Sequence, residues 1–277
     1  MPEYTTDELK EQRREILNEN IGRYKFLRAN RLDGLSQEEI WMSDPKKFND
    51  PFDLNFNIED LIYRGPFQNE QKLRRAFAEI FLENSEITNH WFYDDYFVET
   101  LKNWIDGHAL SIEIIEAFKL RLSAFGVSCF AQDWDVPLMW SHYTDSHKGI
   151  CVEYAVNQMK FARARENLTF GQYNVRYTTD VPTTCVSELL FTPHRVLGNV
   201  IATKHADWSY EREWRLVHFT DKENHVPMPK HMQISALIVG LNFDMAEIET
   251  VISKAACLKV PAYKTVRGHG RMLLQSL

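Results

Sequence analysis

The sequence lacks several features that identify whole classes of protein at once. Four cysteines are widely separated along 277 residues, and no Cys-x-x-Cys pair occurs. We therefore expect neither a disulfide framework nor a zinc site, but four reduced thiols in a cytoplasmic protein. No apolar run is long enough to span a bilayer, and the N-terminus lacks a charged-then-apolar signal pattern. Neither a membrane segment nor a membrane partner is expected.

Glycine-rich phosphate loops, internal repeats and low-complexity segments are missing as well. The net charge of −7 argues against indiscriminate binding to nucleic acid or to an anionic membrane. What remains is an ordinary globular composition, with 44% hydrophobic and 26% charged residues and a high aromatic share of 13%. Much of that aromatic content sits beside polar residues in three segments.

The secondary-structure patterns predict an α+β fold, with residues 1–277 forming one domain. Apolar residues recur at helical spacing over 67–123, which indicates an inserted helical lobe, while 21–66 and 124–277 are expected to form a sheet core. Strands are predicted at 22–28, 39–43, 127–130, 149–154, 173–177, 211–219, 234–239 and 262–266. Outside the insert, helices are predicted at 7–20, 137–147, 186–202 and 244–257.

The most informative segment is WSYEREWRLV at 208–217. On a strand, Glu211, Glu213 and Arg215 would share one face and bulky apolar residues the other. A carboxylate on a rigid strand can stabilise a developing cation, a second can orient an acceptor, and the arginine would keep Glu213 ionised by pairing. The alternative is a surface strand whose charges form a cross-strand ladder.

A second segment, from Trp134 to Gly149, combines aromatic residues with histidines. If 137–147 is helical, His142 and Tyr143 share one side, where they could stack on a heteroaromatic ring and bond to ribose or phosphate. The alternative is that Trp140 and Tyr143 belong to the core and His142 is a satisfied polar group.

Two other kinds of site have little support. A metal site made of His142, Asp145 and His147 is disfavoured because histidines five residues apart do not share a helical face, so no metal is expected. His205 and Asp207 have no nucleophile nearby, which argues against a Ser/His/Asp triad.

The third segment joins the first strand to the Phe-Asn-Asp-Pro-Phe loop at 48–52. Lys25 or Arg28 at the start of a sheet could bind phosphate, and Asn49 with Asp50 could bind sugar hydroxyls. The alternative for Asn-Asp-Pro is a turn whose side chains satisfy their own backbone, and for Asp50 this alternative is favoured.

Together, the stretches WMSDPKKFNDPFD, CFAQDWDVPLMWSHYTDSHKGICVEY and WSYEREWRLV resemble the bacterial family called domain of unknown function 2971. The resemblance runs from about Tyr24 to about Gly240, and the family name conveys no activity. More distantly, the order of these segments along the chain is similar to that in ADP-ribosyltransferase folds, particularly toxin-like and DNA-modifying ones. This similarity implies a mixed, mainly antiparallel split sheet.

The similarity also implies roles for the late and middle segments. Glu213 would be the catalytic glutamate, and Glu211 completes a Glu-x-Glu pattern. Tyr143, or else Trp140, would clamp the nicotinamide of NAD, with His142 and Arg215 beside it.

The early segment departs from the pattern. Lys25, with Arg28 nearby, stands where a histidine or arginine usually follows a tyrosine. Ser43 is a loose substitute for a Ser-Thr-Ser element, and Asn49 would complete the NAD contacts.

These residues point to an NAD-consuming ADP-ribosyltransferase or NAD glycohydrolase, acting as a bacterial toxin or phage-defence effector. NAD would be its substrate, the acceptor would be protein, DNA, RNA or water, and a neutralising or sensor partner is possible. Two alternatives stay open: a catalytically silent module of the same fold that binds a nucleotide or a partner, and a metal-dependent nuclease or hydrolase.

Overall fold

The computed structural model describes residues 20–60, 109–157, 159–160, 169–219 and 224–277. The chain divides into two compact units: unit 1 comprises 1–43, 126–174 and 207–277, and unit 2 comprises 44–125 and 175–206. The predicted helix at 7–20 lies, apart from Asn20, outside the described residues. The predicted helical insert lies largely outside them too, but its last part forms helix α4 (Ala109–Leu122). None of the helices in the described ranges is long and apolar enough to cross a membrane.

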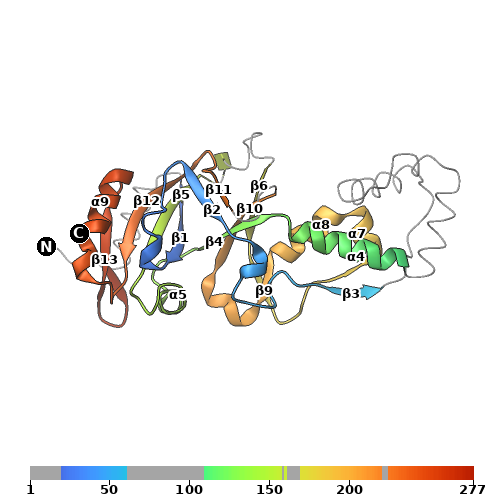
Figure 1. Cartoon of the computed structure of the whole chain (residues 1–277). Helices are drawn as coiled ribbons and strands as arrows, with labels where there is room; N and C mark the ends of the chain where they lie inside the picture. The colour runs from blue at the N-terminus through green and yellow to red at the C-terminus, as the bar shows by residue number, and fades with distance from the viewer. Residues whose placement is uncertain (1–19, 61–108, 158, 161–168, 220–223) are drawn as a thin grey trace. The chain divides into compact units, whose positions relative to one another are not determined.

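Unit 1 is built on an eight-stranded sheet with the order β14-β13-β12-β5-β1-β4-β10-β6 (Figure 1). Its strands are β1 (Ile21–Leu27), β4 (Gly126–Ala131), β5 (Ile150–Val156), β6 (Phe170–Asn174), β10 (Glu213–His218), β12 (Met232–Val239), β13 (Ala262–Arg267) and β14 (Met272–Ser276). All neighbouring strands are antiparallel except β12 and β13. A parallel pair needs a crossover, and the turn η6 (Met245–Glu247) with helix α9 (Ile248–Leu258) supplies it. The expectation of an α+β fold with a mainly antiparallel sheet is confirmed.

One face of this sheet packs against a two-stranded ribbon, β2 (Glu39–Met42) with β11 (Asn224–Pro227), and against α9. We call it the ribbon face. The residues that form its apolar cluster come from the sheet, the ribbon and the helix, and include Phe130, Val152, Tyr154, Trp214, Ile40, Met42, Val226, Val251 and Leu258.

The opposite face packs against the short helix α5 (Pro137–Tyr143), and we call it the α5 face. Tyr24, Phe26 and Ala131 lie there with Met139 and Trp140 of the helix. Directly paired residues of antiparallel strands project to the same face. Because β1 and β10 each pair with β4, the register decides which side chains of the two strands meet.

Two predicted elements end earlier or start later in the structure. The helix predicted over 137–147 ends at Tyr143, because Asp145, Ser146 and His147 take positive φ angles of 51°, 57° and 69°. The strand predicted over 211–219 starts at Glu213, because the preceding residues form the 3₁₀ turn η5 (Ala206–Glu211).

The strand predicted over 173–177 is divided between the units. Its first part belongs to β6 in the large sheet, and its second part is β7 (Arg176–Thr178), which pairs in parallel with β9 (Thr203–His205) of unit 2. Periodicity alone could not detect this change of partner, because both halves are extended.

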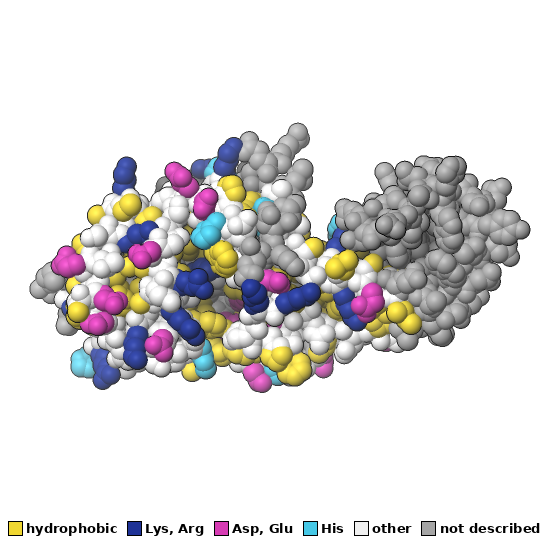
Figure 2. Space-filling view, viewed as in Figure 1, with side chains coloured by type: hydrophobic (Ala, Val, Ile, Leu, Met, Phe, Trp, Pro, Cys, Tyr) yellow, Lys and Arg dark blue, Asp and Glu magenta, His cyan; other side chains and the backbone are white. Residues whose placement is uncertain are grey.

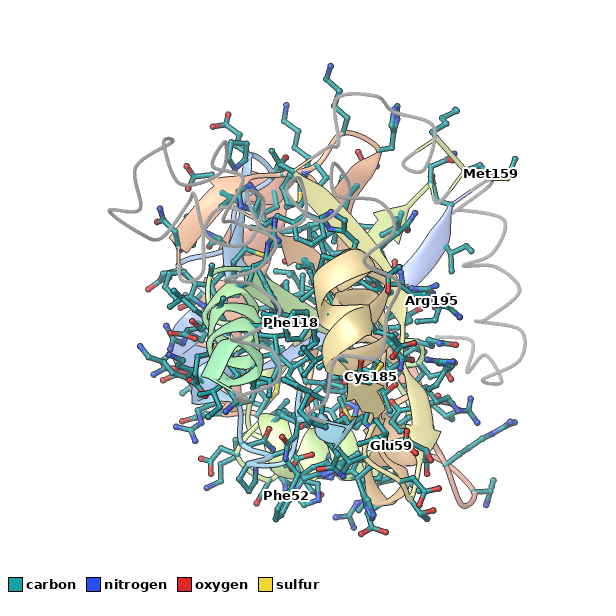
Figure 3. The ribbon with its side chains drawn as sticks, turned by 90° about the vertical axis from the view of Figure 1, so that its right-hand side faces the viewer. Phe52, Glu59, Phe118, Met159, Cys185 and Arg195 are labelled. Atoms are coloured by element: carbon teal, nitrogen blue, oxygen red, sulfur yellow. The ribbon has the colours of Figure 1, made fainter. Side chains whose placement is uncertain are left out.

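Unit 2 combines two small parallel strand pairs with three described helices. The second pair is β3 (Asn57–Asp60) with β8 (Thr183–Cys185). Helix α4 packs beside α7 (Val186–Phe191), and α7 leads into α8 (Pro193–Ile201) (Figure 3). The single helix predicted over 186–202 is therefore two. A proline disfavours the helical conformation of the residue before it, and Thr192, which precedes Pro193, separates α7 from α8.

Candidate functional site

The carboxylate segment lies in the interior of unit 1 rather than on its surface. Strand β10 runs between β4 and β6, and Glu213 pairs with Ala131, which in turn pairs with Tyr24 of β1. Glu213 therefore projects from the α5 face, as does Arg215 two residues later. Glu213 is 4% exposed and Arg215 is 0% exposed. The surface charge ladder that the sequence left open is excluded by this burial.

Arg215 holds Glu213 by a two-point contact. Its Nε donates to Oε1 at 3.1 Å and its Nη2 donates to Oε2 at 3.0 Å. A guanidinium matches a carboxylate in this paired geometry, which fixes the orientation of both groups. The pairing predicted from the i, i+2 spacing is thus present.

Glu211 reaches the site by another route. The prediction that it shares the strand with Glu213 is wrong, because Glu211 ends η5 and Arg212 turns the chain with a φ of 43°. Arg212 then points to Asp133, with Nη1 2.7 Å from Oδ2. Glu211 is nevertheless 2% exposed. Its Oε1 accepts a hydrogen bond of 2.5 Å from the Tyr143 hydroxyl.

Helix α5 places Tyr143 by anchoring Trp140 one turn earlier. The Trp140 indole is fully buried, donates from Nε1 to the Trp134 carbonyl at 2.7 Å and packs edge-on to Phe26 with ring centroids 5.2 Å apart. Trp140 is therefore a core residue, and its proposed role as a nicotinamide clamp is not supported. Tyr143, half-buried at the edge of the same cluster, keeps its hydroxyl on Glu211.

Aromatic side chains that the sequence analysis did not single out extend this cluster. The exposed His142 ring lies 6.0 Å from the ring of Tyr210, and Tyr210 lies 6.1 Å from Trp208. Both come from η5, the turn that carries Glu211. The signal that could have found them is their place within WSYERE, immediately before the first glutamate.

Lys25, expected in the same cleft as Glu213, lies on the other face of the sheet. It pairs with Val152, and its Nζ lies 5.1 Å from the centre of the Phe130 ring on the ribbon face. The ammonium also donates to the Ser128 hydroxyl. Burial lowers the pKa of Lys25 to about 8, although the Cys129 thiol and, through the sheet, the Glu213 carboxylate partly offset this.

The other residues predicted to contact NAD come from several parts of the chain. Ser43 lines a pocket together with Lys25, and Arg28 is exposed just after β1. Asn49 belongs to unit 2. In the same loop, Asp50 accepts from the Phe52 amide at 2.9 Å, which confirms the turn that the sequence favoured for Asp50.

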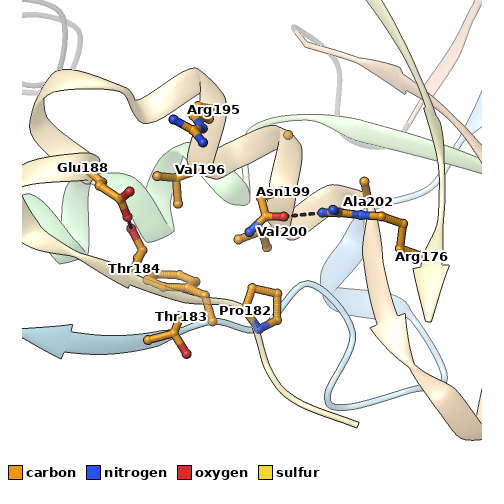
Figure 4. Close-up of a pocket in the computed structure, with 12 residues that line it drawn as sticks. Arg176, Pro182, Thr183, Thr184, Glu188, Arg195, Val196, Asn199, Val200 and Ala202 are labelled. Carbon is orange, nitrogen blue, oxygen red and sulfur yellow. Dashed lines mark hydrogen bonds between the residues drawn. The ribbon is translucent and has the colours of Figure 1, made fainter. Parts of the chain in front are cut away.

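Unit 2 has its own polar features. Lys204 and Asp53 form a buried ion pair, with Nζ 3.7 Å from Oδ2, which ties the Phe-Asn-Asp-Pro-Phe-Asp loop to β9. A cavity of about 420 Å³ lies beside α8 (Figure 4). In its wall Arg176 donates to Asn199, and the Thr184 hydroxyl donates to Glu188 at 2.9 Å.

Within the described ranges no three His, Cys, Asp or Glu side chains converge in a way that could hold a metal ion. The side chains described above supply two carboxylates, a phenol, a guanidinium and nearby aromatic rings.

Comparison with known proteins adds one finding. Residues 139–216 match the family model described as "Protein of unknown function (DUF2971)". The match starts within α5 and ends within β10, so it includes Tyr143, Glu211, Glu213 and Arg215. It supports the family resemblance stated above. No curated protein and no solved structure gives a significant match to the chain.

Proposed function

We propose that the chain is an NAD-consuming enzyme with an ADP-ribosyltransferase-like fold, and that its reactive centre lies on the α5 face. The observation that supports this most is the hydrogen bond from Tyr143 to Glu211. It joins two segments 68 residues apart in the chain, the middle aromatic segment and the late Glu-x-Glu segment. These are the two segments to which the resemblance assigns nicotinamide binding and catalysis.

Glu213 would stabilise the transition state. Breaking the bond between ribose C1′ and the nicotinamide nitrogen sends the bonding electron pair to nicotinamide, and positive charge develops on the ribose ring. A preorganised carboxylate stabilises such a charge without reorganisation cost. Arg215 would hold that carboxylate in one orientation.

Glu211 and the aromatic residues would serve the other parts of the reaction. Glu211 would accept the proton of the attacking hydroxyl or water and so orient the acceptor. The rings of Tyr143, His142 and Tyr210 would offer flat surfaces to the nicotinamide ring and exclude water from it. The acceptor would be a protein, a nucleic acid or water, which fits a toxin or phage-defence effector that a partner protein neutralises or triggers.

The test is to incubate the purified protein with NAD and with protein, DNA and RNA acceptors. We expect nicotinamide release and a mass increase of one ADP-ribose on one acceptor class, or free ADP-ribose if water is the acceptor. Glu213→Gln should lower the rate by at least about a hundredfold, the range of a lost electrostatic stabiliser. Glu249→Gln, at an exposed position of α9, is the matched control and should leave the rate unchanged.

Loss of activity counts only if the variant folds. Glu213→Gln removes the carboxylate that Arg215 contacts, and removing one partner of a buried ion pair costs about 3–5 kcal/mol. The double variant Glu213→Gln/Arg215→Met removes both charges of the pair and tests the same step, and thermal unfolding shows whether each variant folds. An active double variant, or a wild type that leaves NAD intact with every acceptor, would contradict the proposal.

A second function is favoured by one specific observation. Both oxygens of Glu213 are engaged by Arg215, and the side chain is almost fully buried. Such a carboxylate also suits a catalytically silent module that binds a nucleotide or a partner. Calorimetric NAD binding without nicotinamide release would select this function, whereas chelator-sensitive cleavage of nucleic acid would select a metal-dependent nuclease.

A further inference from the structure

The ribbon face of unit 1 carries a pocket of about 330 Å³ to which Glu211, Glu213 and Tyr143 do not contribute. Its walls come from β1, β2, β5, β11 and the loop at 30–36. Figure 2 shows the surface in the orientation of Figure 1, with basic, acidic and hydrophobic side chains interspersed over unit 1. The volume falls at the lower end of the range of small-molecule sites.

The pocket has a cation in its wall. Lys25 lines it, with its ammonium over the Phe130 ring and a hydrogen bond to Ser128. An ammonium group carries three hydrogen-bond donors. Removing the ammonium from water is costly unless hydrogen-bond acceptors or an anion replace the lost hydration. The phenol of Tyr154, which is 3% exposed, lines the same wall and can donate a further hydrogen bond.

The rim of the pocket offers an aromatic surface. Trp41 of β2 is 37% exposed, and its ring packs edge-on to His225 of β11 with centroids 5.0 Å apart. His225 Nδ1 in turn lies 3.9 Å from Glu39 Oε2. Arg31 also lines the pocket, so its charges are two basic side chains, one carboxylate and one histidine. A partly exposed tryptophan on the rim of a pocket that basic side chains line suits a ligand that carries both a flat ring and negative charge.

We propose that this pocket binds a nucleoside monophosphate, with the phosphate at Lys25 and the base against Trp41. This site lies on the opposite face of the sheet from Glu213. It does not depend on NAD cleavage, and it assigns Lys25 and Ser43 to a second ligand rather than to the NAD of the α5 face.

Calorimetric titration with adenosine monophosphate, adenosine and inorganic phosphate tests the proposal, with guanosine, cytidine and uridine monophosphates as further ligands. We expect at least one monophosphate to bind at least about tenfold more tightly than either adenosine or inorganic phosphate. Adenosine lacks the phosphate that would contact Lys25, and inorganic phosphate lacks the base that would contact Trp41. Lys25→Met and Trp41→Ala should each weaken that binding about tenfold or more. Lys25→Arg, which keeps the charge, should weaken it less.

Lys148→Met removes an exposed lysine elsewhere on unit 1 and is the matched control. Thermal unfolding of each variant shows whether it folds. Glu213→Gln/Arg215→Met should bind the monophosphate like the wild type, so failure of the NAD proposal and failure of this one are distinguishable. The inference is overturned if no monophosphate binds at millimolar concentration, if phosphate or adenosine binds equally well, or if Lys25→Met in folded form binds normally.

Discussion

The pair formed by Glu213 and Arg215 shows what a buried charge does and does not explain. Replacing a buried ion pair by well-packed apolar residues is often neutral or stabilising, so the pair is weak evidence for a stabilising role. Both groups are nevertheless held in the interior of the α5 face in a two-point contact. A site that needs a carboxylate fixed in one orientation gives a reason for such a pair, whereas stability alone does not.

Lys25 gives a pH-dependent prediction. The pKa of its ammonium is about 8 in the folded protein against 10.5 as the ordinary value, because burial disfavours the charged form. Below pH 8 both folded and unfolded chains hold the proton, so the cost of the buried charge is fully present. Between pH 8 and 10.5 the unfolded chain holds more protons, and stability therefore rises with pH through this group.

We accordingly expect Lys25→Met to be more stable than the wild type at pH 7, by about 1–3 kcal/mol. The advantage should shrink steadily towards pH 10. Urea unfolding of both proteins at several pH values measures the difference in their free energies of unfolding. The contributions of the other titrating groups are common to both proteins and cancel in this difference. A difference that stays constant from pH 7 to pH 10 would show that the pKa of Lys25 is ordinary.

At the same scale, the two aromatic residues of Met-Trp-Ser-His-Tyr show how far the sequence could predict roles. Trp140 and Tyr143 lie three residues apart on α5, and their sequence context is compatible with a ring clamp or with a core position for each. In the structure Trp140 is wholly buried and Tyr143 is not. The choice depends on how α5 is rotated against β1, which is a long-range property that the local sequence does not contain.

At the scale of elements, the connection from α5 to β5 has an unusual backbone conformation. Asp145, Ser146 and His147 are three consecutive non-glycine residues with positive φ. Such angles cost energy in L-residues and persist only where the surroundings fix them. The backbone around Gly240 does so, since the Asn242 amide donates to the His147 carbonyl at 3.0 Å. This connection directly follows Tyr143 and so helps to set the end of α5.

Gly240→Ala tests that constraint. A Cβ at Gly240 would lie 2.1 Å from the His147 carbonyl oxygen, whereas a Cβ at Gly34 would meet nothing closer than 3.7 Å. We expect Gly240→Ala to lower the free energy of unfolding by about 1–3 kcal/mol, as other overpacked substitutions do. Gly34→Ala should change it by less than about 1 kcal/mol. Urea titrations give both values, and equal effects of the two substitutions would contradict the close approach.

The junction of η5 and β10 shows why one predicted strand was partly wrong. Alternation over 211–219 fits an extended segment, so sequence reasoning placed Glu211 and Glu213 on one strand. The positive φ of Arg212 ends the alternation and turns Glu211 towards Tyr143. Nothing in a Glu-Arg-Glu sequence signals this turn, because arginine has no special preference for positive φ.

At the scale of the whole molecule, the register of the sheet places the predicted site residues on opposite faces. Tyr24, Ala131 and Glu213 form one row, and a shift of one residue moves a side chain to the opposite face. Lys25 follows Tyr24 and so belongs to the ribbon face. The sequence predicted strands in the large sheet but missed its last one, β14, which follows the segment 262–266 predicted to be last, and it could not give the order of the strands in the sheet. Without that order, the segregation of Lys25 from Glu213 was not predictable.

The division into two units was equally hard to predict. Unit 2 consists of two separate stretches of the chain, residues 44–125 and 175–206. Its parallel pairs join strands that are far apart in sequence and only three or four residues long. Such short strands carry too few residues for a period to be recognised.

The proposed function depends on the hydrogen bond between Tyr143 and Glu211, and a double-mutant cycle on the rate of nicotinamide release from NAD is its sharpest test. Tyr143→Phe and Glu211→Gln each remove one side of the hydrogen bond. If the two groups act as one unit, each single variant is slowed, and the double variant is no slower than the worse single one. Independent, multiplicative losses, or a wild type that releases no nicotinamide, would contradict the account.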